Sequence, residues 1–225
     1  MINALKSLVR GWSPGKRRTV FIIFIPATFL LIAGFIASIY TLRVYYSKVY
    51  GIYLTPVNVH EIVNIPYYLQ NDSQWGGETI GDSNRKMSGA GCLITCVANA
   101  MDNLGLTVTP GDVNAKLTEA GGFQGADLIW YKINEIWPEI QYRYTRDFSS
   151  ALIESDLSAG LLPIVNVKIH GVGATHWLLV VGAVNGEFMA FDPLNKEKKP
   201  IPLSTHGKVY AYRVLYKNVL GTNET

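Results

Sequence analysis

The sequence predicts an α+β fold in which helices occupy the first half of the folded region and antiparallel strands the second, behind one N-terminal transmembrane helix. Three observations support this prediction. Residues 19–42 form an apolar run without a charge. Helical periodicity is found between 92 and 160, and β-rich runs with a hairpin signal extend from 162 to 216. Helices and strands segregated in this way are typical of the α+β class.

Basic residues are concentrated at the N-terminus of the 225-residue chain, whose formal net charge is +3. Five of the 20 basic residues, and no acidic residue, precede residue 19. They are Lys6, Arg10, Lys16, Arg17 and Arg18. Acidic residues outnumber basic ones in the rest of the chain, so we expect no nucleic-acid binding by the folded part. Two cysteines are too few for a disulfide framework, which leaves each a catalytic or core role.

The apolar run at 19–42 is long enough to cross a hydrocarbon core of about 30 Å as a tilted helix. Pro26 lies near its start and is tolerated in membrane helices. A cleaved signal peptide is the alternative, but the run exceeds the roughly 7–15 apolar residues of such signals. The basic residues before the run outnumber Arg43 and Lys48 just after it, which predicts a cytoplasmic N-terminus.

These bounds divide the chain into four expected parts in a single-pass protein of the cell membrane. The parts are a basic cytoplasmic tail over 1–18, the transmembrane helix over 19–42, a stalk over 43–56 and an extracytoplasmic domain over 57–225. The catalytic residues discussed below all lie in the last part.

Apolar residues at helical spacing predict four helices in the exported part. The first begins at Cys92 and ends at Gly105, a residue type that commonly terminates a helix. The second begins after the Thr109 cap, with Pro110 in its first turn, and closes at Gly121. The third covers 126–137, and the fourth runs from a Ser149 or Ser150 cap to Gly160.

Runs rich in β-branched and aromatic residues predict the strands. Asn185-Gly186 lies between two of these runs and is a strong hairpin signal. The expected strands cover 57–63, 65–70, 141–145, 162–169, 177–184, 187–191 and 208–216.

Cys92 is placed in the first turn of a helix that is otherwise apolar. Unpaired N–H groups and the helix dipole at that position favour an anion, so a thiolate would be stabilised there. The thiolate is the nucleophilic form of cysteine. Cys96, one turn later, is expected in the core, where a cysteine behaves as a small hydrophobic residue.

A cysteine nucleophile needs a base, and the base needs an orienting partner. His176 stands where a glycine-rich loop enters a buried strand, and Asp192 ends the next strand at the same end of the hairpin. A two-residue loop at Asn185-Gly186 would place their side chains on opposite faces of the sheet. A three-residue loop or a β-bulge would place them on the same face. If the two residues act together, the sequence predicts one of these two arrangements.

Four short motifs follow one another in a characteristic order. They are Gln70-Asn71-Asp72 with Trp75, Gly91-Cys92 opening an apolar helix, His176-Trp177 in a strand, and Phe191-Asp192-Pro193 in the next strand. Over roughly residues 62–217 the chain resembles the bacteriocin-leader-peptidase-like family of papain-fold cysteine peptidases. The resemblance implies a papain-like fold, with Cys92 as nucleophile, His176 as general base and acid, Asp192 as its orienting partner and Gln70 as oxyanion donor. The backbone N–H of Cys92 is a second candidate donor.

The resemblance implies hydrolysis of a peptide or amide bond, with a peptide or peptidoglycan-like substrate. The best-known members lie at the cytoplasmic front of peptide exporters and cut after a double glycine. This chain has the opposite expected topology, so that specificity is not carried over. Two alternatives stay open: a cell-wall amidase or endopeptidase, and a papain-like peptide-binding module without turnover.

No cofactor or metal is expected. His170 and His176 are six residues apart on a flexible loop and lack the company of further ligands. The fragment Gly171-x-Gly173 leads into a strand rather than a helix, which argues against a phosphate cradle. The sequence does not predict an oligomeric state.

Overall fold

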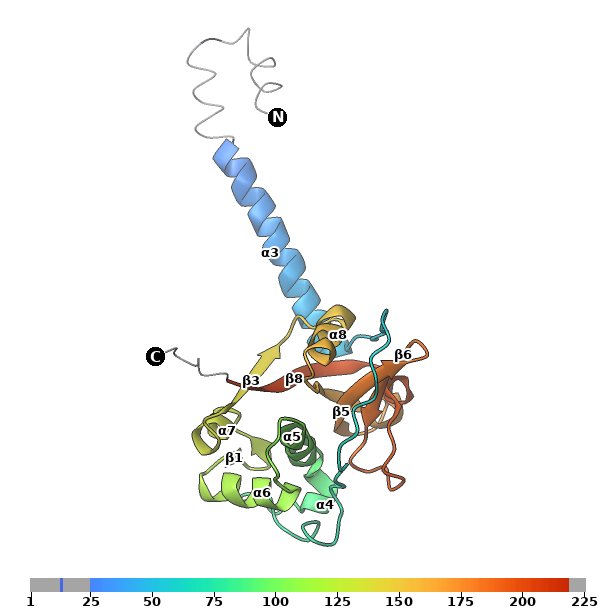
Figure 1. Ribbon diagram of the computed structural model, residues 1–225. Helices are drawn as coiled ribbons and strands as arrows, with labels where there is room; N and C mark the ends of the chain where they lie inside the picture. Colours follow the sequence, from blue (N-terminus) through green and yellow to red (C-terminus); the bar gives the residue numbers. More distant parts are fainter. Residues whose placement is uncertain (1–12, 14–24, 219–225) are drawn as a thin grey trace, which may run out of the picture. The chain divides into compact units, whose positions relative to one another are not determined.

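The computed structural model describes residue 13 and residues 25–218. The chain divides into two compact units, Met1–Tyr45 and Tyr46–Thr225, and each is described by itself. The five basic residues on which the predicted orientation rests, and the first part of the apolar run at 19–42, lie outside the described residues. Figure 1 traces the order of the elements along the chain.

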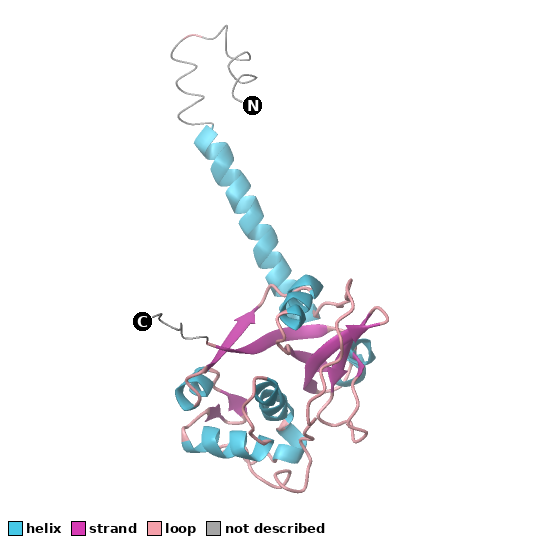
Figure 2. Cartoon of the chain, viewed as in Figure 1, coloured by secondary structure: helices cyan, strands magenta, loops and turns pink. Residues whose placement is uncertain are grey.

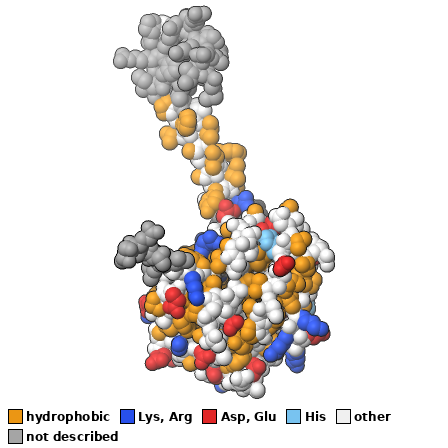
Figure 3. Space-filling view, in the orientation of Figure 1, with side chains coloured by type: hydrophobic (Ala, Val, Ile, Leu, Met, Phe, Trp, Pro, Cys, Tyr) orange, Lys and Arg blue, Asp and Glu red, His pale blue; other side chains and the backbone are white. Residues whose placement is uncertain are grey.

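Helix α3 covers Ile25–Tyr50 and carries the rest of the predicted membrane run. Large apolar side chains stand exposed along it, among them Phe29, Leu31 and Phe35 (Figure 3). In the described part of the chain, the window Pro26–Arg43 is the one stretch of helix long and apolar enough to cross a membrane, and none of it is buried. A helix with this composition and position is typical of a membrane span or a signal sequence.

The segment expected to be a stalk, 43–56, is divided in the structure. Its first residues continue α3 to Tyr50, and Ile52 then pairs with Val209 through backbone hydrogen bonds of 2.9 and 2.8 Å. Gly51 makes the turn between them with a φ of 64°, and a Cβ there would lie 2.9 Å from Lys208. The second half of this segment therefore lies against the folded domain, because a strand edge is available to pair with it.

Helices dominate the first half of the second unit, in agreement with the sequence. They are α4 (Met87–Ala90), α5 (Cys92–Asn103), α6 (Pro110–Glu119), α7 (Tyr131–Ile136) and α8 (Ser150–Ser158). Helix α6 begins with a capping box in which Thr109 and Asp112 exchange hydrogen bonds, as its sequence leads one to expect. Ser149 caps α8 by accepting from the N–H of Leu152.

The helix predicted over 126–137 is mostly wrong. Only α7 is helical there, and the residues before it form a small hairpin of β1 (Phe123–Gln124) and β2 (Asp127–Leu128). Gly125 lies between the two strands with a φ of 63°, which favours a tight turn over a helix. The apolar periodicity that predicted a long helix therefore belongs to two elements.

A six-stranded antiparallel sheet fills the second half, in the order β3-β8-β4-β5-β6-β7. Its strands are β3 (Ile140–Thr145), β4 (Ile164–Lys168), β5 (Thr175–Val184), β6 (Glu187–Phe191), β7 (Ile201–Pro202) and β8 (Val209–Lys217). Short 3₁₀ helices, η2 (Ile169–Gly171) and η3 (Leu203–His206), lie between strands. Figure 2 shows the sheet between α8 and the group of α5, α6 and α7.

The two strands predicted over 57–63 and 65–70 are wrong. That stretch is extended but pairs with β5 only locally, through a bridge between His60 and Ala183 and a hydrogen bond of 2.8 Å from the N–H of Val63 to the carbonyl of Val181. A run of β-rich residues thus lies along a strand without forming a continuous ladder with it.

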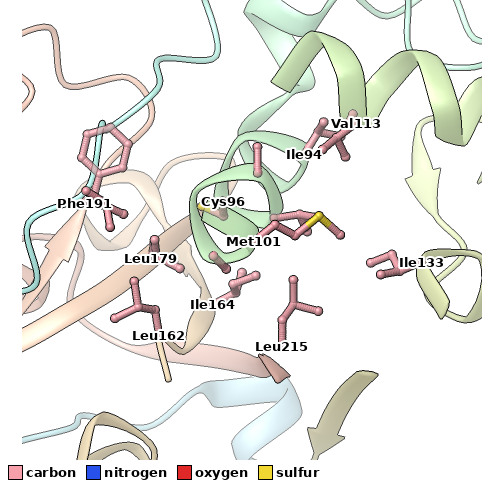
Figure 4. Packing of buried hydrophobic residues seen from close by; sticks show 14 of the residues in the cluster. Ile94, Cys96, Met101, Val113, Ile133, Leu162, Ile164, Leu179, Phe191 and Leu215 are labelled. Atoms are coloured by element: carbon pink, nitrogen blue, oxygen red, sulfur yellow. The ribbon is translucent and has the colours of Figure 1, made fainter. Parts of the chain in front are cut away.

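Each face of the sheet covers its own apolar cluster, because side chains alternate along a strand. Leu179 on β5 belongs to the cluster under α5, together with Cys96 and Met101, and Figure 4 shows these side chains converging. Leu178, the neighbour of Leu179, belongs to the other cluster, to which α8 contributes Ile153. The α+β class predicted from the sequence is therefore confirmed.

Candidate active site

Cys92 is the first residue of α5, and α4 ends only two residues before it. Gly91 joins the two helices, and a Cβ there would lie 2.6 Å from the carbonyl oxygen of Met87, so a glycine is needed at this junction. The side chain of Cys92 is partly exposed. A thiol at this position can be reached from outside and lies at the positive end of a twelve-residue helix.

Cys96 differs from Cys92 in its burial. It is fully buried in the cluster under α5, and its thiol donates a hydrogen bond of 3.5 Å to the carbonyl of Trp177. Burial raises the pKa of the Cys96 thiol well above its ordinary value. The expectation that Cys96 is a core residue is confirmed.

The register of the β5–β6 hairpin brings His176 and Asp192 to one face. The hairpin loop contains two residues, since Val184 pairs with Glu187. The register then shifts at Val181, which forms a β-bulge. Of the two arrangements that the sequence allowed for a working pair, the bulge is confirmed and the three-residue loop is wrong.

His176 and Asp192 form a buried pair. Nε2 of the imidazole lies 2.7 Å from Oδ1 of the carboxylate, which also accepts a hydrogen bond of 2.8 Å from the N–H of Leu194. His176 is 3% exposed and Asp192 is 8% exposed. The ring is therefore held through Nε2, and Nδ1 is its second nitrogen.

The protonation of this pair follows from its contacts. Burial alone would lower the pKa of His176, but hydrogen bonds to Asp192 and to Cys92 outweigh it and raise the pKa to about 9. Burial raises the pKa of Asp192, but the hydrogen bond from His176 and the nearby ring of His206 outweigh it and hold the pKa well below the usual range. At neutral pH the pair is therefore an imidazolium beside a carboxylate.

Gln70 is buried and lies between the hairpin and the helices that precede Cys92. Its N–H donates a 3.0 Å hydrogen bond to the carbonyl of Pro193, the residue after Asp192. Its side-chain Nε2 donates a 2.8 Å hydrogen bond to the carbonyl of Ser88 in α4. These contacts fix the amide nitrogen beside α4.

His206 contacts the candidate site and was not singled out from the sequence. It is 2% exposed at the end of η3, and its Nε2 lies 3.5 Å from Oδ2 of Asp192. Its local sequence, Ser204-Thr205-His206-Gly207, reads as a polar turn without a motif. Its place at the candidate site follows only from the position of η3 beside the end of β6.

Among the residues that the structure describes, no group of three or more His, Cys, Asp or Glu side chains is arranged to hold a metal ion. The side chains described above supply a thiol, an imidazole, a carboxylate and an amide. That set matches the requirements of acyl transfer to sulfur.

Of the comparisons with known proteins, the one with solved structures bears on the fold. No protein-family model matches the sequence, and no curated protein matches it significantly. Among solved structures, the chain is similar to one described as a C39-like peptidase from Bacillus anthracis, with a TM-score of 0.50 and 13% sequence identity. The match covers 72% of this chain and 98% of that one. At this identity the likeness shows a shared C39-like peptidase fold and leaves the activity to be argued from the site.

Proposed function

We propose that this chain is a membrane-anchored extracytoplasmic cysteine peptidase that hydrolyses a peptide or amide bond. The single observation that supports it most is the position of His176, a buried imidazole that is hydrogen-bonded to Asp192 and close enough to Cys92 for the sulfur to raise its pKa. A nucleophile, a base and an orienting carboxylate in that order are the parts of a thiol hydrolase.

In the proposed reaction, Sγ of Cys92 attacks the carbonyl carbon of the substrate while His176 holds the proton taken from the thiol. The carbonyl oxygen becomes negative and is stabilised by the N–H of Cys92 and the amide of Gln70. The carbon–nitrogen bond then breaks as His176 gives its proton to the leaving amine. A thioester remains on Cys92.

Water completes the cycle. His176, now neutral, takes a proton from a water molecule that attacks the thioester, and the carbon–sulfur bond breaks to release a carboxylic acid and the thiol. Asp192 stays a carboxylate throughout, because its hydrogen bonds to His176 and to Leu194 keep its pKa low. Its role is to hold the imidazole in one orientation and to stabilise the imidazolium.

The anchor is the second part of the proposal. The exposed apolar side chains of α3 would lie in a lipid bilayer, and the basic residues before residue 19 would keep the N-terminus in the cytoplasm. Protease added to intact cells should then cleave residues 60–218. Protection of that part until the cells are opened would contradict the predicted orientation.

Turnover by the full chain in detergent tests the hydrolase proposal. The purified protein and its Cys92→Ser variant would be incubated with a peptide library and, separately, with purified cell wall, and the products identified by mass spectrometry. We expect cleavage that depends on Cys92. Products from cell wall alone would identify an amidase or endopeptidase of the wall, and binding of peptides by both proteins without cleavage would identify a binding module and contradict the proposal.

A further inference from the structure

The two oxygens of the Asp192 carboxylate have different partners. Oδ1 is held by Nε2 of His176 and by the N–H of Leu194, at 2.7 and 2.8 Å. Oδ2 faces Nε2 of a second buried histidine, His206, at 3.5 Å. A carboxylate bound through one oxygen only can turn about its last side-chain bond, so a donor at Oδ2 is needed to keep Oδ1 aimed at His176.

The backbone fixes which nitrogen of His206 carries the proton. Its Nδ1 accepts a hydrogen bond of 3.2 Å from the N–H of His170 and therefore has no proton. In the neutral ring the proton then lies on Nε2, which points to Asp192. His170 presents this N–H with a φ of 50°, and Gly207, which follows His206, has a φ of 74°. Two left-handed residues thus bring η2 and η3 together at this contact.

The separation of 3.5 Å is longer than an ordinary hydrogen bond, and Nε2 of His206 has no closer partner within the described chain. In this contact the N–H dipole at Nε2 of His206 points toward the buried carboxylate of Asp192. Because both side chains are largely buried, water screens this contact less than it would a surface contact. Burial of the polar Nε2 of His206 without a close hydrogen-bond partner is unfavourable, and this nitrogen points toward the pair of Asp192 and His176.

We propose that His206 is a positioning residue for the thiol hydrolysis proposed above: its Nε2–H holds Oδ2 of Asp192, so that Oδ1 stays aligned with Nε2 of His176. His206 does not touch the substrate. It acts through Asp192, and the candidate site is then a sulfur, two imidazoles and a carboxylate, in the order Cys92, His176, Asp192, His206. The expected effect of His206 on kcat rests on the proposed function. Its expected effect on the pKa of His176 rests on the contacts alone.

The surroundings of Asp192 allow the contact to be tested chemically. Asp192 and His206 line a cavity of about 360 Å³. The ionisable groups that line this cavity are His170 on η2, Asp192 after β6, Glu197 in the loop before β7, and His206 on η3. Those that bear on the charge of His176 are Cys92 on α5 and Asp192. A small imidazole molecule added to solution has room to enter beside Asp192 when the ring of His206 is removed.

Two substitutions separate the two nitrogens of His206. In His206→Gln the amide nitrogen can take the place of Nε2 and still donate to Asp192. In His206→Asn the shorter amide reaches only the position of Nδ1, beside the N–H of His170, and leaves Oδ2 without a donor. His170→Asn is the matched control, since it removes a stacked imidazole at 5.6 Å but keeps the backbone N–H and tolerates the left-handed conformation.

The readout is the pKa of His176, followed by NMR of the full chain in detergent, with its ring signals identified by their loss in His176→Gln. We expect His206→Asn to lower that pKa by about one unit or more, and His206→Gln and His170→Asn to leave it near the value of the unsubstituted chain. In turnover, His206→Asn should lower kcat about tenfold without a matching change in KM, and millimolar imidazole should restore part of the kcat lost in His206→Ala.

Equal pKa values for His176 in the Gln and Asn variants would overturn the proposal, as would imidazole without effect on His206→Ala. The pKa measurement needs no substrate. A difference between Gln and Asn in a chain that turns over nothing would therefore uphold the role of His206 at Asp192 while it contradicts the proposed function. Circular dichroism of each variant shows whether it is folded. If His206→Asn does not fold, the comparison of His206→Gln with His206→Ala, with and without imidazole, tests the proposal instead.

Discussion

Nε2 of His176 lies 2.7 Å from Oδ1 of Asp192, although a two-residue hairpin loop with regular pairing would place the two side chains on opposite faces of the sheet. The β-bulge at Val181 removes the conflict by adding one residue to β5. Beside the bulge, the carbonyl of Val181 accepts from Val63 and Ala183 pairs with His60. The segment before the candidate site thus supports the irregularity that assembles it.

Gly182 is the residue on which the bulge depends most directly. A Cβ there would lie 2.9 Å from the carbonyl oxygens of His60 and Glu61, and backbone atoms cannot move aside as a flexible side chain would. We expect Gly182→Ala to lower the free energy of unfolding by about 1–3 kcal/mol and to lower the pKa of His176 by loosening its contact with Asp192.

Urea denaturation and NMR would measure the two effects of Gly182→Ala. Gly77→Ala is the matched control, because nothing lies within 4 Å of a Cβ at that position. A Gly182→Ala protein as stable as the control, with an unchanged His176 pKa, would show that the crossing segment does not support the bulge.

Asp192→Asn tests the charge on the carboxylate separately from its shape. Asparagine can keep a hydrogen bond to the imidazole but not the negative charge that favours the imidazolium. We expect the pKa of His176 to fall from about 9 toward its ordinary value of 6.5, as measured by NMR titration. Asp192→Ala should lower it at least as far and also lower kcat further, since orientation is lost as well. An unchanged pKa in both variants would mean that another group holds the proton on His176.

Stability should depend on pH through the same pair. The folded-state pKa of His176, about 9, is above its value of 6.5 in the unfolded chain, so its contribution is fully present below pH 6.5 and is lost as pH rises through 9. Asp192 has a lowered pKa, so its contribution is present above 3.8 and is lost in acid.

The difference in unfolding free energy between the unsubstituted chain and His176→Gln should therefore shrink between pH 6.5 and pH 9.5. Denaturation with urea at several pH values measures it. A difference that stays constant over this range would argue that His176 is not protonated in the folded protein.

Gln70→Ala should lower kcat by about 10²–10³-fold if the amide of Gln70 stabilises an oxyanion. The same substitution should leave the rate at which iodoacetamide alkylates Cys92 nearly unchanged, because alkylation creates no oxyanion. Parallel measurements of turnover and alkylation separate the two. An equal loss in both would indicate that Gln70, through its hydrogen bond to Ser88, only positions the start of α5.

Helix caps and apolar periodicity, which depend on residues close in sequence, made some elements predictable from the sequence. The Thr109 cap and Pro110 defined the start of α6, and the change to helical periodicity at Cys92 defined the start of α5. The class of fold followed from the order of such elements. Patterns of this kind depend on neighbours within a few residues, which a sequence displays.

The features that could not be predicted depend on partners distant in sequence. The stretch 57–70 has the composition of strands, but it lies where β5 offers isolated contacts rather than a free edge. The choice between a bulge and a longer loop depended on what crosses beside Gly182. His206 contacts Asp192 only because η2 and η3 meet, and nothing in its own neighbourhood indicates this.

Activation of the Cys92 thiol by His176 can be measured as the rate at which iodoacetamide alkylates Cys92 at near-neutral pH. Mass spectrometry would locate the adduct, and Cys92→Ser would provide the blank, since Cys96 is buried. We expect the unsubstituted chain to react about tenfold or more faster than His176→Ala. Equal rates in the two proteins would contradict it.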